Sequence, residues 1–201
     1  MNIKGFVKIT PDRILSDSDI PLYEGHGLQL LHSAFKSLGT GYAKFYKMDP
    51  LCKLGFVASE ILLAGEEGRF EEREDRAVIL MNRSSSLADD RHYVRTVEDP
   101  NNYYPSPSVF VYTLPNIITG EIAIRNKYHG ETCFHVLPSA DPEMIYDIVT
   151  DAFQDRITRS ALAGWTECAS DDDFEAVMFL VDADGDGTGF TPESIERIME
   201  L

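Results

Sequence analysis

The segment VDADGDGTGFTPESI, residues 181–195, carries carboxylates at the spacing of a calcium-binding loop. EF-hand positions 1, 3, 5, 6 and 12 are filled by Asp182, Asp184, Asp186, Gly187 and Glu193. Position 8 is Gly189 instead of a branched apolar residue, and the sequence has no second loop of this kind. The preceding AVMFLV favours a strand over the helix that an EF-hand requires. The sequence therefore favours an acidic turn before a short helix capped by Thr191, with calcium binding as the alternative.

Thiols and imidazoles, the other side chains that hold metals or attack carbonyl groups, have no site-like spacing. The three cysteines are Cys52, Cys133 and Cys168, and the five histidines are His26, His32, His92, His129 and His135. The cysteines match neither a zinc motif nor a disulfide framework. The histidines lack the spacing of a metal-binding pair. The sequence predicts no metal site on these residues and no bound cofactor.

The charge of the chain limits its partners. The 201 residues include 34 acidic and 18 basic side chains, which gives a formal net charge of −16. Nucleic acids and anionic membranes are polyanions, so neither is expected as the main partner. The N-terminus lacks the apolar stretch of a secretory signal, and no apolar run reaches the roughly 18 residues of a membrane span. We expect a cytoplasmic protein.

Strand and helix patterns alternate along the chain. Helices are predicted over residues 48–65, with Asp49 as cap, over residues 114–130, and over residues 139–157. Apolar strands are predicted over residues 3–9, 76–82, 132–137, 160–168 and 175–183. Strands that are apolar throughout are buried on both faces. The sequence therefore predicts an α/β fold with a mixed, mostly parallel sheet covered by helices on both faces.

The order of these segments resembles the β-ketoacyl-acyl-carrier-protein synthases, or ketosynthases, of the thiolase fold. The matching features are Pro107-Ser108, Pro115-Asn116, Gly120 with Ile122-Ala123-Ile124, and Gly130, after which Glu131 replaces the usual proline. The segment FYKMDPLCKLGFVASEILL is similar to the family's Arg-Met-Asp helix. SALAGWTEC is similar to its Leu-Ala-Gly-Gly strand, with Trp165 in place of a glycine. The resemblance implies a single domain, residues 1–201, equivalent to the N-terminal half of a ketosynthase.

The resemblance also implies where the family's nucleophilic cysteine should stand. A few residues beyond Gly130, before the helix that starts near Asp141, this position holds Ser139. A serine without an adjacent base is a much weaker nucleophile than a thiolate. Cys133 lies six residues earlier on a predicted strand and is expected to be a small buried residue. The family's catalytic histidine pair belongs to a C-terminal half that this sequence does not include. Condensing activity by this chain alone is therefore not expected.

Three functions follow from these features. The first is a non-catalytic ketosynthase-like subunit of fatty-acid or polyketide-type biosynthesis, paired with a full-length ketosynthase or with a second copy. The pairing would use an apolar helical face or the strand over residues 133–137. The second is an acyltransferase or hydrolase-like enzyme that uses Ser139, and the third is a calcium-binding module. An acyl carrier protein is a further candidate partner. Carriers are acidic, so docking would need a basic patch, for which Arg125 and Lys127 are candidates.

Overall fold

The computed structural model describes residues 1–98, 100–101 and 104–201. Its strands are β1 (Asn2–Ile9), β2 (Arg13–Ser16), β3 (Pro21–Glu24), β4 (Arg76–Asn82), β5 (Thr132–Val136), β6 (Ser160–Ser170), β7 (Asp173–Asp182) and β8 (Thr188–Gly189). Its helices are α1 (Gly27–Leu38), α2 (Pro50–Leu62), α3 (Leu87–Val97), α4 (Pro107–Val111), α5 (Ile117–Asn126), α6 (Pro142–Ala152) and α7 (Pro192–Met199), with a 3₁₀ turn η1 (Ala43–Lys47). Within these residues no helix is both long and apolar enough to cross a bilayer.

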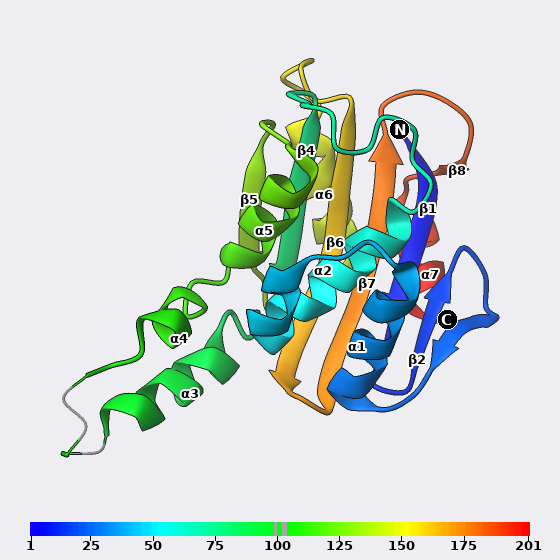
Figure 1. Cartoon of the computed structure of the whole chain (residues 1–201). Coiled ribbons are helices and arrows are strands. Elements are labelled where there is room, and N and C mark those ends of the chain that lie inside the picture. Colours follow the sequence, from blue (N-terminus) through cyan, green and yellow to red (C-terminus); the bar gives the residue numbers. More distant parts are fainter. Residues whose placement is uncertain (99, 102–103) are drawn as a thin grey trace.

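The strands form one mixed sheet in the order β3-β2-β1-β7-β6-β4-β5, with β8 paired to β1 (Figure 1). Among the strands of the described residues, β4 pairs in parallel with β5 and with β6, and the other strand pairs are antiparallel. The prediction of a mostly parallel sheet was therefore wrong. The reason is the length of the connections: β6 reaches β7 through residues 171–172 alone, and so short a connection joins only antiparallel strands. The connections between β4, β5 and β6 are long and contain helices, which allows β4 to pair in parallel with β5 and with β6.

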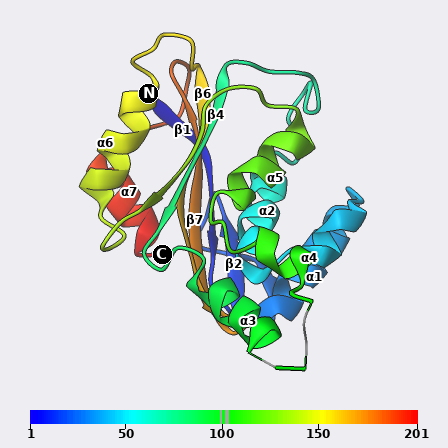
Figure 2. The same cartoon turned by 90° about the vertical axis from the view of Figure 1, so that its left-hand side faces the viewer.

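Two apolar clusters lie on opposite faces of the sheet, as the alternating side chains of β4 show. Val78 and Leu80 belong to one cluster, and Ala77, Ile79 and Met81 belong to the other. Figure 2 shows α1, α2 and α5 on one side of the sheet and α6 and α7 on the other. The apolar run of β4, residues 77–81, is thus explained, because every residue of this strand is buried.

Helix α2 is fixed at its start and along its length. The carboxylate of Asp49 accepts hydrogen bonds from the amides of Leu51 (3.0 Å) and Cys52 (3.2 Å), as its predicted capping role requires. At Gly55 the helix approaches α5 so closely that a Cβ there would lie 2.3 Å from Ile118 Cδ1. The Asp49 cap thus fixes the start of α2, and Gly55 lets the helix pack closely against α5.

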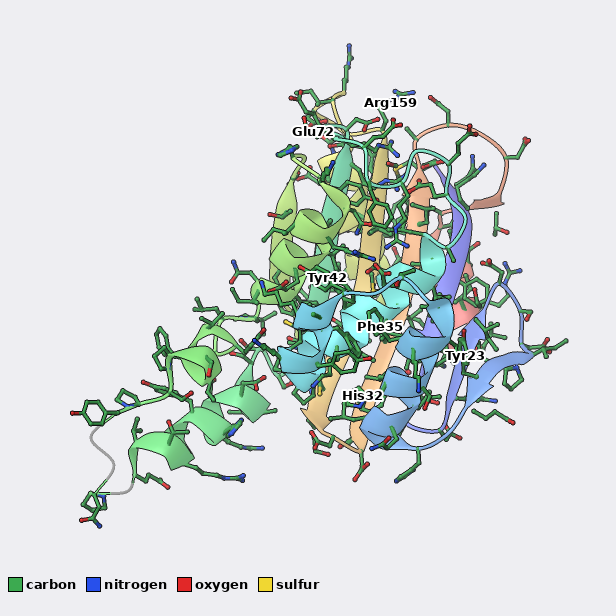
Figure 3. All side chains as sticks on the ribbon, in the orientation of Figure 1. Tyr23, His32, Phe35, Tyr42, Glu72 and Arg159 are labelled. Atoms are coloured by element: carbon green, nitrogen blue, oxygen red, sulfur yellow. The ribbon has the colours of Figure 1, made fainter. Side chains whose placement is uncertain are left out.

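An aromatic group fills the space between α1, η1 and α2. The rings of Phe35 and Phe45 stack with centroids 4.0 Å apart, and those of Tyr42 and Phe56 stack at 5.1 Å. Figure 3 places Phe35 and Tyr42 beside α2 on the same face of the sheet. This packing attaches η1, which leads into α2, to the main core.

Helices α3 and α4 extend away from the sheet beside its lower end in Figure 1. The ring of Tyr93 on α3 contacts that of Phe110 on α4, with centroids 5.4 Å apart. At the base of α3, Ser86 Oγ donates to the carbonyl of Thr113 at 2.6 Å. The pair is therefore held together by its own contacts and joined to the body at its base.

Candidate functional site

The predicted nucleophile position lies in the turn between β5 and α6. Strand β5 runs parallel to β4 from the Val78–Thr132 pair onward, and the amide of Leu137 still donates to the carbonyl of Asn82 at 2.8 Å. Pro142 then begins α6. Residues 138–141 therefore form a sharp strand-to-helix turn, the local geometry that the resemblance implies for a nucleophile.

Ser139 is exposed in this turn. Its carbonyl accepts a hydrogen bond from the amide of Asp141 at 3.0 Å. Within the described parts of the chain, its hydroxyl makes no hydrogen bond to a base. A serine hydroxyl needs an adjacent base or another activating group to act as a nucleophile. Ser139 therefore lies in the strand-to-helix turn where the nucleophile was expected, but it lacks the neighbouring base that acyl transfer by a serine requires.

The amides at the start of α6 are occupied by Asp141. Its Oδ1 accepts hydrogen bonds from the amides of Glu143 (2.9 Å) and Met144 (3.4 Å). Asp141, and not Ser139, is therefore the capping residue of this helix. Free amides at a helix N-terminus can stabilise an oxyanion, but here the carboxylate of Asp141 already accepts their hydrogen bonds. The start of α6 is electrostatically unsuited to a developing negative charge.

Cys133 is a packing residue. It is half-buried on β5 and contacts the apolar cluster that includes Leu137 and Ile145. Burial raises the pKa of its thiol to about 11, with a smaller contribution from the charge of Glu131. The thiol is therefore protonated at neutral pH, and the thiolate is the reactive form. His135, two residues further along β5, makes no hydrogen bond to Ser139 in the described structure.

The acidic segment after β7 forms a turn and not a helix-flanked loop. Strand β7 pairs with β1 and β6 up to Asp182, and β8 then pairs with the start of β1. Asp184 forms an ion pair with Arg159, and Glu193 lies in the first turn of α7, which Thr191 caps. In residues 1–98, 100–101 and 104–201, no group of three His, Cys, Asp or Glu side chains is arranged to hold a metal ion. The strand and the helix predicted on either side of this turn are confirmed.

The basic pair suggested by the sequence does not form a free patch. Arg125 donates to Glu60 Oε1 at 3.2 Å and to the carbonyl of Thr40 at 3.0 Å. Arg69 also binds Glu60, whose carboxylate is fully buried. Only Lys127 of the suggested pair is exposed.

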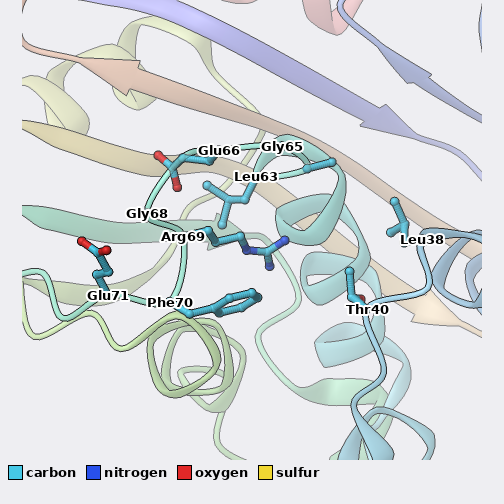
Figure 4. A pocket seen from close by; sticks show the side chains of 10 residues that line it. Leu38, Thr40, Leu63, Gly65, Glu66, Gly68, Arg69, Phe70 and Glu71 are labelled. Carbon is cyan, nitrogen blue, oxygen red and sulfur yellow. The ribbon is translucent and has the colours of Figure 1, made fainter.

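Beside this ion cluster is a shallow cavity of about 580 Å³ (Figure 4). Figure 4 shows the side chain of Arg69 directed into the space between Phe70 and Leu63. Phe70 has a positive φ of 81° and 43% exposure, an unusual backbone conformation for a bulky residue. Arg69 is already bound to Glu60 and to Asn126, so its guanidinium is not free to hold a ligand in this cavity.

The sequence did not indicate a second cavity, of about 760 Å³, between the start of α2, α3 and the β6–β7 turn. Asp49, Lys53 and Asp89 line it, and all three are buried. Burial and a hydrogen bond to Asp49 raise the pKa of Asp89 to about 8. Asp89 therefore carries its proton at neutral pH. Asp49 and Asp89 are 40 positions apart, and only the fold brings them together.

Comparison with known proteins identifies the fold. No family model and no curated protein sequence matches the chain. Among solved structures it is similar to the ishigamide ketosynthase/chain length factor, with a TM-score of 0.60 and 19% identity over 90% of this chain and 61% of that chain. It also matches a type II PKS acyl-carrier protein in complex with its ketosynthase, AntDE:AntF, with a TM-score of 0.59 and 12% identity over 98% of this chain and 64% of that chain.

A third similar structure is the ketosynthase ApeO in complex with its chain length factor ApeC from Xenorhabdus doucetiae. The TM-score is 0.55 and the identity 11%, over 100% of this chain and 91% of that chain. The chain thus spans about three fifths of the length of the first two of these structures. The predicted ketosynthase-like thiolase fold is confirmed.

Proposed function

Proceeding from a ketosynthase-like thiolase fold, we propose that this chain is a synthase-like subunit of fatty-acid or polyketide-type acyl-chain biosynthesis. It does not condense acyl units by itself and acts with a full-length ketosynthase. The observation that carries this proposal is the turn between β5 and α6. Ser139 stands there with its hydroxyl unbound to any base in the described chain, and Asp141 occupies the amides of α6. We further propose that residues 1–201 form one domain.

The outer edge of β5 is our candidate for the partner surface. In the described sheet, β5 is the terminal strand and pairs only with β4. An unpaired edge offers backbone donors and acceptors to a strand of another chain. Val136 on this strand is 55% exposed, and Ile124 on the adjacent α5 is 67% exposed. Pairing with a ketosynthase would cover this edge, and a homodimer through the same edge is the alternative.

An acyl carrier is a further candidate partner, since AntDE:AntF is a carrier in complex with its ketosynthase. The Arg125–Lys127 patch supports this role less well than the sequence suggested, because Arg125 is bound to Glu60. Carrier docking at that place would depend on Lys127. We therefore place the ketosynthase first among the partners.

The decisive experiment is the intact mass of the chain after incubation with an acyl-loaded carrier protein. We expect no acyl adduct, and the same result with Ser139→Ala. An adduct on the wild-type chain that Ser139→Ala abolishes would contradict a non-catalytic role. It would instead support the second function, an acyltransferase or hydrolase-like enzyme that uses Ser139.

A further inference from the structure

The cavity between the start of α2, α3 and the β6–β7 turn has two rims of opposite charge. Arg91 and Arg95 of α3 form the basic rim, and Asp171 and Asp172 of the turn form the acidic rim. All four side chains are exposed. Asp172 lies 3.6 Å from a ring nitrogen of His26, but within residues 1–98, 100–101 and 104–201 no ion pair joins one rim to the other. Each rim therefore presents charge that another molecule can pair with.

The formal charges of this face cancel, although the chain as a whole has a net charge of −16. The cavity is lined by four Lys or Arg side chains and by four Asp side chains. An average patch of the chain is negative, so two copies repel each other there, whereas two neutral faces do not. Charges more than about 8 Å away are largely screened at physiological ionic strength, so the local balance decides whether two copies repel.

Helix α3 also exposes large apolar side chains beside the basic rim. Leu87, Val94 and Val97 are all exposed. Their spacing of seven and three residues places them on one face of the helix, together with Arg91. Figure 1 shows that α3 extends away from the sheet, at the same end as the β6–β7 turn. Burial of this apolar stripe against another chain would stabilise a complex, because apolar surface leaves water.

A face with a basic rim beside an acidic rim is complementary to itself. In a dimer with twofold symmetry the same surface of both copies meets, and each contact occurs twice with the copies exchanged. The basic rim of each copy then lies against the acidic rim of the other. We propose that this face binds a second copy of the chain, with the rims paired in this way and Leu87, Val94 and Val97 buried in the interface. The face is separate from the edge of β5, and the proposal does not depend on the function proposed above.

Charge reversal tests the pairing of the rims. Exposed ion pairs add little affinity, but like charges placed opposite each other oppose an interface strongly. Sedimentation equilibrium of the wild-type chain at up to about 200 μM should show a dimer with a Kd on the order of 10 μM. Arg91→Glu/Arg95→Glu and Asp171→Lys/Asp172→Lys should each weaken this dimer about tenfold or more.

A mixture of the two reversal variants supplies the sharpest readout. In a mixed dimer the glutamates of one variant face the lysines of the other, and the second contact keeps the wild-type side chains. The equimolar mixture should therefore form a mixed dimer with an affinity within about threefold of that of the wild type. All substituted side chains are exposed, so the Tm of each variant should match that of the wild type.

The matched control is Lys36→Glu/Lys127→Glu, at two exposed residues outside this face. It changes the net charge as much as Arg91→Glu/Arg95→Glu does, and it should dimerise as the wild type does. An equal loss of the dimer in both variants would show a general effect of charge and overturn the proposal. A monomeric wild type, or no association in the mixture of reversal variants, would overturn it as well. A dimer that Val136→Lys breaks and the reversals leave intact would place self-association at the edge of β5 instead.

Discussion

Asp89 on α3 and Asp49, which caps α2, line the same cavity, and burial together with Asp49 raises the pKa of Asp89 to about 8. Both side chains are buried, at 5% and 7% exposure. Two ionised carboxylates buried beside each other would repel strongly, which favours the protonated form of Asp89. The pair joins the base of the α3–α4 extension to the first turn of α2, and its protonation state therefore bears on stability.

The first prediction is that the free energy of unfolding falls between pH 6 and pH 9. Burial and the contact with Asp49 raise the pKa of Asp89 from 3.8 to about 8. Between these values the folded state binds more protons than the unfolded state, so stability decreases as pH rises. We expect Asp89→Asn, whose amide still donates to Asp49, to be more stable than the wild type at pH 9 by on the order of 1–3 kcal/mol.

Urea unfolding of both proteins at pH 6 and pH 9 measures this effect. The difference between Asp89→Asn and the wild type should be larger at pH 9. Asp90→Asn, a half-buried neighbour on the same helix, is the control and should follow the wild type. If the free energy of unfolding changes equally with pH in Asp89→Asn and in the wild type, Asp89 is ionised over the whole range and the prediction is wrong.

The second prediction concerns Glu60, which is fully buried between Arg69 and Arg125. Glu60→Gln removes the carboxylate and leaves two guanidinium groups without their counterion. Breaking a buried pair in this way costs about 3–5 kcal/mol. Chemical denaturation should show this loss for Glu60→Gln, whereas the exposed Glu71→Gln should change the free energy of unfolding by less than about 0.5 kcal/mol. A loss below about 1 kcal/mol for Glu60→Gln would mean that water compensates both arginines.

The elements that the sequence predicted correctly are those with local signals. Helices α2 and α6 begin at an Asp-Pro pair, and the aspartates accept hydrogen bonds from the first amides as expected. Helix α5 ends at Asn126 and not at Gly130, because Lys127 adopts the left-handed conformation with φ of 57°. Gly130 has a different role: a Cβ there would lie 2.4 Å from the carbonyl oxygen of Arg76.

The features that the sequence did not indicate depend on distant contacts. Strands β2 and β3 have four residues each, and β3 is largely exposed, so neither has a clear apolar pattern. Strand direction depends on the lengths of the connections and also on which strands become neighbours, and β1 lies beside β7 and β4 beside β6 although these strands are far apart in the sequence. The acidic residues of α3 have the pattern of a solvated surface, and Asp89 is buried only because α3 packs against α4 and β6, next to the start of α2. The Asp49–Asp89 contact was therefore not predictable.

The third prediction tests the strand that resembles the family's glycine-rich segment. Gly164 on β6 has a φ of 150°, and a Cβ there would lie 2.0 Å from the carbonyl oxygen of Val177 on β7. Gly164→Ala should therefore destabilise the fold by about 3 kcal/mol or more, since backbone must move. Gly120→Ala is the matched control, because a Cβ there meets nothing within 4 Å and the residue is helical; it should stabilise by about 0.5–1 kcal/mol. Thermal unfolding of the two variants should give Tm shifts of opposite sign, and a neutral Gly164→Ala would contradict the close approach of β6 and β7.

The fourth prediction tests the edge of β5 as a partner surface. Val136 is 55% exposed at the end of this strand, so Val136→Lys places a charge at the edge without opening the core. A charged side chain on an edge strand opposes pairing with another chain. We expect Val136→Lys to keep the wild-type Tm and to weaken association with a full-length ketosynthase, or self-association, by about tenfold or more.

Ile157→Lys, at a residue that is 64% exposed and outside β5, is the control. Size-exclusion chromatography with light scattering measures both kinds of complex. Equal loss in the two variants, or no loss in Val136→Lys, would place the partner surface elsewhere on the molecule.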